Sequence, residues 1–362
     1  MIRIILLCAI PGLMFFIFPV GDFSFRLSWQ IVSIFAAGVA FSALLSCWWR
    51  RLFFLLALAQ AAFLPVFPLA YITLMMIAIF LGAAEGFLRI DPESIMDAMC
   101  IAALLLSGWA IGQRLGILPY FNIGAAGHGP FNNTAAGTFI ALCLPAFFRR
   151  KPLGFLFSRP VYRAYAAPAL ALVLLFCDSI TATLAALAAV AVYLVLSGLV
   201  RRWVLVAVGC GCAGLLMLAV LQDFHGAALP KMVTNARWPI WQVAASLITA
   251  EPFGHGLGSF SQIFPQVMHG KFAADVMHAH NEYLQIGFEM GLQGMVLVCL
   301  YPLWVGATAW RKRRRLTEAG RISAAGITAL AVSCMGWHAF HIAPLAVLGA
   351  AWLGMAQREG IS

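Results

Sequence analysis

The stretch "LQIGFEMGLQGMVLVCLYPLWVGATAWRKRRR", residues 284–315, joins a long apolar run to an abrupt basic end. Glu289 is the only charged residue between Leu284 and Thr308. A helix needs roughly 20 mostly apolar residues to cross the hydrocarbon core of a bilayer. Lys and Arg concentrate at the cytoplasmic ends of such helices. The stretch therefore predicts a membrane-spanning helix whose basic end, Arg311–Arg315, lies in the cytoplasm.

The whole chain has a composition similar to that of this segment. Of its 362 residues, 63% are hydrophobic and 10% are charged, whereas soluble domains contain about 45–50% apolar residues. Hydropathy predicts about twelve spans, near residues 2–20, 28–48, 52–66, 69–87, 94–117, 132–148, 164–179, 181–200, 203–221, 284–308, 322–337 and 342–357. The predicted fold class is therefore all-α: a polytopic transmembrane helical bundle with one large periplasmic loop before the tenth span.

Basic residues give this bundle its predicted orientation. In the twelve-span topology, four basic clusters lie on the same side as both termini: Arg50-Arg51, Arg149-Arg150-Lys151, Arg201-Arg202 and Arg311–Arg315. That side is predicted to be cytoplasmic, because positively charged segments remain inside. The net charge of +10 is then mainly a topology signal, and no nucleic-acid partner is predicted.

Histidines gather on the opposite, periplasmic side of this topology. All eight fall there, at positions 128, 225, 255, 269, 278, 280, 338 and 341. Histidine is the side chain that titrates near neutral pH, so the distribution suggests chemistry at the periplasmic face. The alternative is that the outer loops are longer and hold more polar residues of every kind.

The longest predicted loop divides the chain into three parts: an N-terminal membrane bundle of about nine spans (1–221), a periplasmic loop (222–283) and a C-terminal bundle of about three spans (284–362). The loop contains "NARWPIWQVAASLITAEPFGHGLGSF", residues 235–260. Its spacing predicts a helix at the membrane interface, with Trp238 and Trp241 as anchors. Arg237 is either a phosphate contact or part of that anchor. The glycines of "GHGLGS" predict a sharp turn or a close backbone approach.

Polar residues lie just before the tenth span and then along one face of it: His278, His280, Asn281, Glu282, Gln285, Glu289 and Gln293. Strongly polar residues within a span usually face a cavity or the interior of the bundle. Gly287 and Gly291 have the small-xxx-small spacing that allows another helix to pack closely. The stretch therefore predicts a helix whose polar stripe leads to histidines at the water boundary.

Two further polar patches are predicted at the periplasmic ends of other spans. One combines Arg114 with His128 and Asn132 of "FNIGAAGHGPFNNTAAGTFIALCLP", residues 121–145. The other is Trp337 with His338 and His341. The nine cysteines fall within apolar stretches and lack the spacing of a metal site or a disulfide framework. No metal site is predicted.

The segments "ARWPIWQVAASLITAEPFGHGLGSF" and "HAHNEYLQIGFEMGLQG" resemble the bacterial O-antigen ligase and polymerase superfamily. The resemblance implies a glycosyltransferase that moves a glycan from undecaprenyl diphosphate to an acceptor at the periplasmic face of the inner membrane, without a metal or another cofactor. An O-antigen ligase, with the lipid A core as acceptor, is the first hypothesis. A polymerase acting on glycan repeats, or a protein O-oligosaccharyltransferase, is the alternative.

The resemblance also implies roles for individual residues. Arg237 corresponds to the arginine that contacts the diphosphate, and His280 to the general base. Asn281 and Glu282 would orient that base, and His278 is a weaker candidate for the same task.

One departure from the family pattern is visible. Where the family carries a Ser-Arg step at the outer end of the eighth span, this chain has Ser179-Ile180. Arg114 is the candidate substitute, and Asn132 belongs to a span that also resembles the family. The missing arginine leaves an inactive family member as an alternative.

A transporter is the alternative from another functional class, with Glu289 and the histidines as a proton relay. Against it, the sequence shows no internal inverted repeat and no matched pair of broken helices, which are typical of such proteins. The polar groups also gather at one predicted face of the membrane, whereas a transporter binds its substrate near the midplane.

Overall fold

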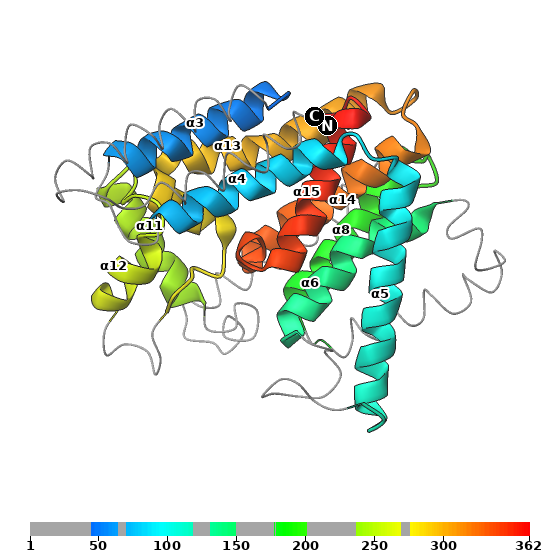
Figure 1. The fold of residues 1–362 in the computed structure, drawn as a ribbon, viewed down its shortest axis with the longest axis horizontal. Helices are drawn as coiled ribbons and strands as arrows, with labels where there is room; N and C mark the ends of the chain where they lie inside the picture. The colour runs from blue at the N-terminus through cyan, green and yellow to red at the C-terminus, as the bar shows by residue number, and fades with distance from the viewer. Residues whose placement is uncertain are drawn as a thin grey trace, which may run out of the picture. The chain divides into compact units, whose positions relative to one another are not determined.

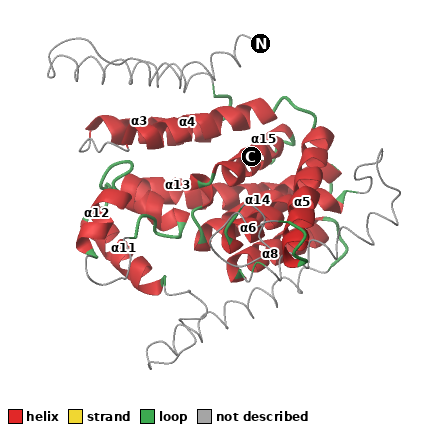
Figure 2. Ribbon diagram, turned by 60° about the horizontal axis from the view of Figure 1, so that its bottom comes forward, coloured by secondary structure: helices red, strands yellow, loops and turns green. Residues whose placement is uncertain are grey.

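The computed structural model describes residues 45–63, 70–118, 131–149, 177, 179–200, 237–268 and 276–362. Within these ranges the backbone forms helices and turns without a strand (Figure 2). Contacts divide the chain into two compact units: Met1–Leu88 with Ile240–Leu300, and Arg89–Pro239 with Tyr301–Ser362. Each unit combines an earlier and a later stretch of the chain, so both depend on long-range packing.

Three of the described helices are long and apolar enough to cross a membrane: α5 (Pro92–Arg114), α13 (Glu282–Lys312) and α14 (Glu318–Gly336). Shorter helices occupy five other predicted spans: α3 (Trp48–Phe63), α4 (Ala70–Phe87), α6 (Asn133–Cys143) with η1 (Leu144–Phe148), α8 (Ile180–Leu196) and α15 (Ala343–Arg358). The predicted all-helical membrane fold is confirmed at this level. The spans near 2–20 and 203–221, and nearly all of those near 28–48 and 164–179, lie outside the described residues. The count of twelve and the three-part division by topology stay predictions.

In the first unit, α3 and α4 run alongside the early part of α13 (Figure 1). Their shared core contains Phe54, Leu58 and Leu81 together with Met290 of α13. A buried ion pair joins Arg50 of α3 to Glu85 of α4, with 3.3 Å between Nη1 and Oε2. Two charges in an apolar unit are tolerated when they neutralise each other.

A second core in this unit surrounds two helices of the predicted loop. These are α11 (Trp238–Ala250), of which all but the first two residues belong to this unit, and α12 (Phe260–Val267). Phe260 stacks on Phe264 and meets the edge of Phe288 of α13. The described loop residues 240–268 therefore form an aromatic-rich structure that packs against the start of α13.

The second unit is a bundle of α5, α6, α8, α14 and α15 (Figure 1). Small residues allow its helices to approach closely. The fully buried Trp352 of α15 covers Gly326 of α14, and its indole Nε1 donates a 2.9 Å hydrogen bond to Leu142 O of α6. Thr181, at the start of α8, occupies the space over Gly336, at the end of α14. A side chain at either glycine would force these helices apart.

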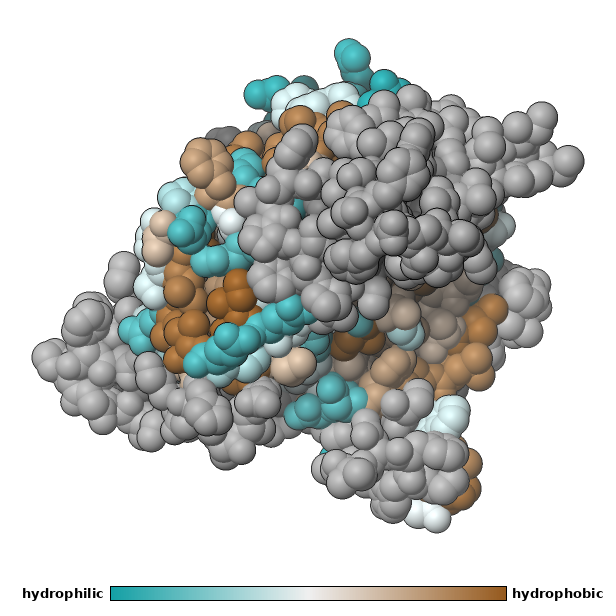
Figure 3. Space-filling view, turned by 60° about the vertical axis from the view of Figure 1, so that its left-hand side comes forward, coloured by the Kyte–Doolittle hydropathy of each residue, from teal (hydrophilic) through white to brown (hydrophobic). Residues whose placement is uncertain are grey.

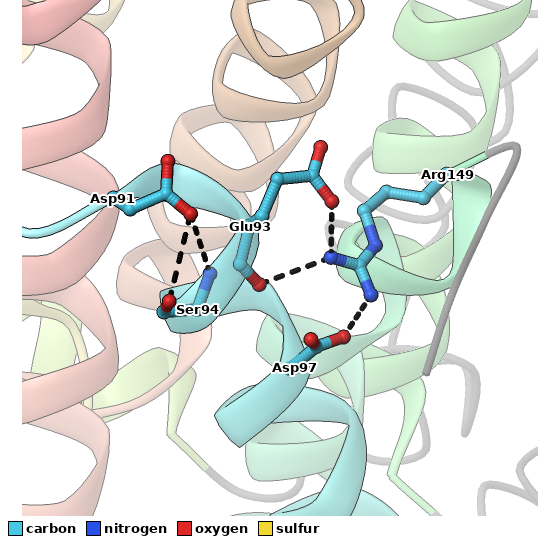
Figure 4. Close-up of polar contacts among 5 residues, drawn as sticks. All are labelled: Asp91, Glu93, Ser94, Asp97 and Arg149. Carbon is cyan, nitrogen blue, oxygen red and sulfur yellow. Dashed lines mark hydrogen bonds and ion pairs between the residues drawn. The ribbon is translucent and has the colours of Figure 1, made fainter. Parts of the chain in front are cut away.

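Charged residues join several segments of the second unit. Arg149 bonds Glu93 at 2.6 Å and also pairs with Asp97, both in the first turns of α5 (Figure 4). Asp91 caps the same helix through a 3.2 Å bond from Ser94 N. Lys312 Nζ donates to Gly360 O at 2.6 Å. Hydropathy predicts all of these segments on the cytoplasmic side.

Apolar side chains reach the surface of the described residues (Figure 3). Leu303 and Trp304 of α13 and Leu187 of α8 are examples of large exposed apolar side chains. In water such a surface is unusual for a protein of this size. It is expected for helices that face lipid acyl chains.

Candidate functional site

The helix α13 is interrupted at Gly291, whose backbone has φ 75° and ψ −178°. A positive φ is readily adopted only by glycine, so this residue ends one helical segment and lets another begin. The prediction that Gly291 provides a helix-packing surface was wrong. Gly287 does have that role, because a Cβ added to it would lie 3.1 Å from Ile248 Cδ1 of α11.

A loop formed by residues 252–258 satisfies the backbone groups that this break exposes. His255 N donates to Phe288 O at 2.8 Å, and Gly256 N donates to Glu289 O at 3.0 Å. On the other side of the break, Leu292 N donates to Pro252 O at 2.8 Å. Broken helices at membrane depth occur where protein satisfies the backbone in this way. We call residues 252–258 together with 288–292 the glycine clasp.

The clasp requires glycine in both of its segments, 252–258 and 288–292. Gly254, Gly256 and Gly258 all have positive φ values, between 72° and 97°. A Cβ on Gly254 would lie 2.7 Å from Glu289 O, and one on Gly291 would lie 2.5 Å from Pro252 O. The sequence predicted a sharp turn or a close approach for these glycines, and both occur. The approach is to another part of the backbone.

Two glutamines reinforce the clasp. Gln60 of α3 and Gln293 of α13 both donate to Phe253 O, at 2.8 and 3.1 Å. Gln60 is buried and was not singled out in the sequence. The signal that could have identified it is a polar side chain within an otherwise apolar predicted span.

The buried carboxylate of Glu289 connects the clasp to the histidine segment. Its Oε2 accepts a 2.8 Å hydrogen bond from Gly258 N, and its Oε1 lies 3.4 Å from Gln285 Nε2. Gln285 Oε1 in turn accepts from Ala279 N at 3.2 Å, and its Nε2 lies 3.4 Å from His278 Nδ1. The predicted polar stripe is thus an internal hydrogen-bonded row within the first unit.

His280 lies two residues before α13 in an unusual backbone conformation. Its φ is 51°, the left-handed region that non-glycine residues seldom adopt. The preceding carbonyl, Ala279 O, accepts a 2.9 Å bond from Trp241 Nε1 of α11. Trp241 also has this hydrogen bond within the protein, and its expected place at the membrane interface stays a prediction. The His280 side chain is partly exposed.

The two residues after His280 cap and begin α13. Asn281 Oδ1 accepts a 3.1 Å hydrogen bond from Leu284 N, which is the geometry of a helix N-cap. Glu282 is buried in the first turn, where a carboxylate interacts favourably with the helix dipole. These contacts give both residues structural tasks beside the orienting roles that were predicted for them.

Arg237 belongs to the second unit, immediately before α11. Its guanidinium donates to Gly336 O, at the end of α14, and lies 5.4 Å from the ring centroid of Trp337. Burial lowers the pKa of Arg237, but a guanidinium stays protonated at neutral pH. The ring of Trp337 also packs, tilted by 31°, against that of His338, with 4.2 Å between ring centroids. The structure therefore joins Arg237 to the predicted Trp337 patch, a connection that the sequence did not reveal.

The remaining predicted residues lie at helix ends of the same unit. Asn132 caps α6, accepting from Ala135 N at 2.9 Å. Arg114 ends α5 and is exposed. Ser179 caps α8 where the family arginine is missing, and the substitution of Arg114 for that arginine stays a prediction. His128 lies outside the described residues.

In the second unit, the Arg237 guanidinium lies at the end of α14. In the first unit, His280 is held in a left-handed backbone conformation. Residues 165–299 match an O-antigen ligase family model. The match supports the O-antigen ligase superfamily, whose members are glycosyltransferase-like enzymes. No curated protein matches the chain. The O-antigen ligase match includes Arg237, the glycine clasp and His280, and excludes Arg114, Asn132 and Trp337.

Proposed function

We propose that the protein is an integral-membrane glycosyltransferase of the O-antigen ligase type, acting at the periplasmic face of the bacterial inner membrane. Its donor is a glycan carried on undecaprenyl diphosphate. The observation that carries the proposal is the family match over residues 165–299, because that range contains both Arg237 and His280. The reaction requires no cofactor, since the diphosphate donor is already activated.

Arg237 is proposed to bind the donor diphosphate. A guanidinium has five N–H donors in a planar fork that fits phosphate oxygens. One of its nitrogens, Nη1, bonds Gly336 O, and the fork offers further donors to a ligand. Positive charge at this position would stabilise the charge that develops on the leaving diphosphate. Arg114 is proposed to supply a second positive charge, and Asn132 a polar contact, at the donor end.

His280 is proposed to act as the general base. The acceptor hydroxyl oxygen attacks the anomeric carbon of the first donor sugar, and the bond from that carbon to the diphosphate oxygen breaks. The electron pair leaves with undecaprenyl diphosphate, and the hydroxyl proton moves to the imidazole of His280. Water later removes that proton. A general base of this kind contributes about 10²–10⁴-fold in rate. His278, Asn281 and Glu282 are proposed to orient it.

The lipid A core is the proposed acceptor. A glycan repeat unit or a protein hydroxyl are the alternatives, because the same two steps serve any hydroxyl acceptor. The test is transfer by the purified protein from undecaprenyl-diphosphate-linked glycan to each of the three acceptors in parallel. Glycosylated lipid A core as the main product supports the ligase. Elongated glycan or glycosylated protein would instead support a polymerase or an O-oligosaccharyltransferase, and no transfer to any acceptor refutes the proposal.

The broken helix α13 gives a proton-coupled transporter some support, because such proteins often bind ions at discontinuous helices. In this chain, however, the clasp engages the exposed carbonyls: Phe288 O and Glu289 O each accept a backbone N–H. A carbonyl that is bonded in this way is a poor ion ligand. Proton-driven solute uptake into vesicles that contain the protein would support the transporter hypothesis instead.

A further inference from the structure

Ala279, between the two histidines of the proposed base segment, is held by side chains on both of its peptide groups. Its N–H donates to Gln285 Oε1 at 3.2 Å, and its carbonyl accepts from Trp241 Nε1 at 2.9 Å. Fixing both peptide planes restricts the rotation that sets the direction of the next side chain. That next residue is His280, with its φ of 51°.

A left-handed backbone at a non-glycine residue is strained and persists only where surrounding contacts impose it. The contacts at Ala279 are of this kind. Gln285 and Glu289 are only 3% and 5% exposed, and buried polar side chains keep their hydrogen bonds. A water molecule therefore cannot easily replace either side chain.

We infer that Gln285 is a positioning residue for His280, and that Glu289 fixes Gln285 from the glycine clasp. The connection runs from Gly258 N–H to Glu289, from Glu289 to Gln285 Nε2, and from Gln285 Oε1 to Ala279 N–H. Neither side chain exchanges a proton with substrate. The inference rests on the proposed role of His280. Its first test, hydrogen exchange at the Ala279 amide, does not depend on that role.

The chemistry of this row defines a specific exchange of side chains. Gln285→Glu keeps an acceptor for Ala279 N–H but places two carboxylates together at the present 3.4 Å contact. In the double variant Gln285→Glu/Glu289→Gln, residue 285 accepts from Ala279 N–H and from the new amide. Residue 289 still accepts from Gly258 N–H. Each hydrogen bond that links Gly258 N–H to Ala279 N–H is available again, with the charge moved by one helical turn.

The first test is hydrogen exchange at the Ala279 amide in the purified full-length protein, which does not depend on glycan transfer. Gln285→Ala should speed exchange at this amide at least about tenfold, and the double variant should restore slow exchange. The control is Gln266→Glu on the exposed face of α12, which should leave the rate unchanged. Unchanged exchange in Gln285→Ala overturns the inference, whatever reaction the protein catalyses.

The second test is transfer from lipid-linked glycan by the same variants. Misplacing a catalytic group by about 1 Å can reduce the rate about 10²-fold. Gln285→Glu should therefore lower kcat by about 10²-fold with little change in KM, and the double variant should recover to within a few-fold of the unmodified protein. A double variant as slow as Gln285→Glu overturns the positioning role. No transfer by the unmodified protein refutes the proposed function, and the exchange test then decides the row by itself.

Discussion

Gly254 and Gly291 lie backbone to backbone, although 36 residues separate them in the chain. A Cβ on Gly254 would lie 2.7 Å from Glu289 O, and a Cβ on Gly291 would lie 2.5 Å from Phe253 C. Both residues have positive φ. This contact lets a loop supply the hydrogen bonds that α13 lacks where it breaks, so the break and the loop require each other.

Alanine at either glycine should therefore disrupt the clasp. We expect Gly254→Ala and Gly291→Ala each to lower the free energy of unfolding by about 1–3 kcal/mol or more, because the added methyl group meets backbone that cannot rotate away. The measurement is the unfolding midpoint of the purified protein in detergent.

Gly306 provides the matched control, because it lies in the same helix with nothing within 4 Å of an added Cβ. Gly306→Ala should be neutral or slightly stabilising, since alanine favours a helix over glycine by about 0.5–1 kcal/mol. Equal unfolding midpoints for all three variants would exclude a tight contact at the clasp.

Arg237 is predicted to need its guanidinium geometry as well as its charge. We expect Arg237→Ala to reduce glycan transfer by about 10²–10³-fold, the usual effect of losing a donor that stabilises developing charge. Arg237→Lys should recover little, because an ammonium cannot bind phosphate oxygens in the bidentate way. Transfer and donor binding are measured side by side.

Arg313 is the matched control for that substitution. It also donates to a carbonyl, Trp310 O at 3.0 Å, and lies over the Trp310 ring at 4.2 Å. It belongs to the basic cluster predicted to be cytoplasmic, so Arg313→Lys should leave transfer unchanged. Full activity in Arg237→Lys at equal protein levels would rule out a fork-type phosphate contact.

Asn281 should act mainly through the helix cap. Asn281→Ala is expected to lower the free energy of unfolding by about 1 kcal/mol. Asn281→Asp should preserve it, because a carboxylate oxygen can accept from Leu284 N and also interacts favourably with the helix N-terminus. If Asn281→Asp retained stability but lost transfer, the amide would have the orienting role in catalysis that the family resemblance implies.

The predicted topology can be tested independently of the chemistry. Reporter fusions after Gly270 and Thr317 should report the periplasm and the cytoplasm respectively, since the tenth predicted span separates them. The same compartment for both fusions would contradict the twelve-span topology and the periplasmic location of His280.

The helices were largely predictable because apolar runs and basic ends report directly on membrane spans. Eight of the predicted spans contain helices in the described residues, and the glycine turn at 254–259 was anticipated from its composition. The break in α13 was not, because Gly291 also fits a helix-packing pattern. Whether Gly291 packs against a helix or breaks its own helix depends on the backbone of a distant loop, which donates to Phe288 O and Glu289 O.

The contacts of the candidate site were less predictable than its residues. Spacing singled out Trp241 as a membrane anchor and Arg237 as a phosphate contact or part of that anchor. It could not show that Arg237 bonds Gly336 O and that Trp241 bonds Ala279 O. Such partners depend on which helix ends meet in space. Gln60 was missed for the same reason, since its acceptor lies 193 residues away in the chain.

The last prediction distinguishes the role of His280 from that of Glu289. His280→Ala should reduce transfer by about 10²–10⁴-fold, the contribution of a positioned general base, while the protein still folds and binds donor. Glu289→Gln should retain much of the activity and lose less than Gln285→Glu, because Gln285 keeps its direct bond from Ala279 N–H. The remaining carbonyl oxygen of residue 289 can still accept from Gly258 N, the 2.8 Å bond that ties the clasp to α13, and only the weaker 3.4 Å contact with Gln285 is disturbed.

Glu289→Ala tests the same bond by removing its acceptor. It removes both acceptors and leaves the buried N–H of Gly258 without its side-chain partner, which should lower the free energy of unfolding by about 1–3 kcal/mol. The assay compares the three variants for transfer from purified lipid-linked glycan, with unfolding midpoints measured on the same samples. An inactive Glu289→Gln beside a nearly normal His280→Ala would reverse the assignment. The carboxyl proton of Glu289 would then be part of the chemistry, and the proton-relay transporter would become the better explanation of the polar row.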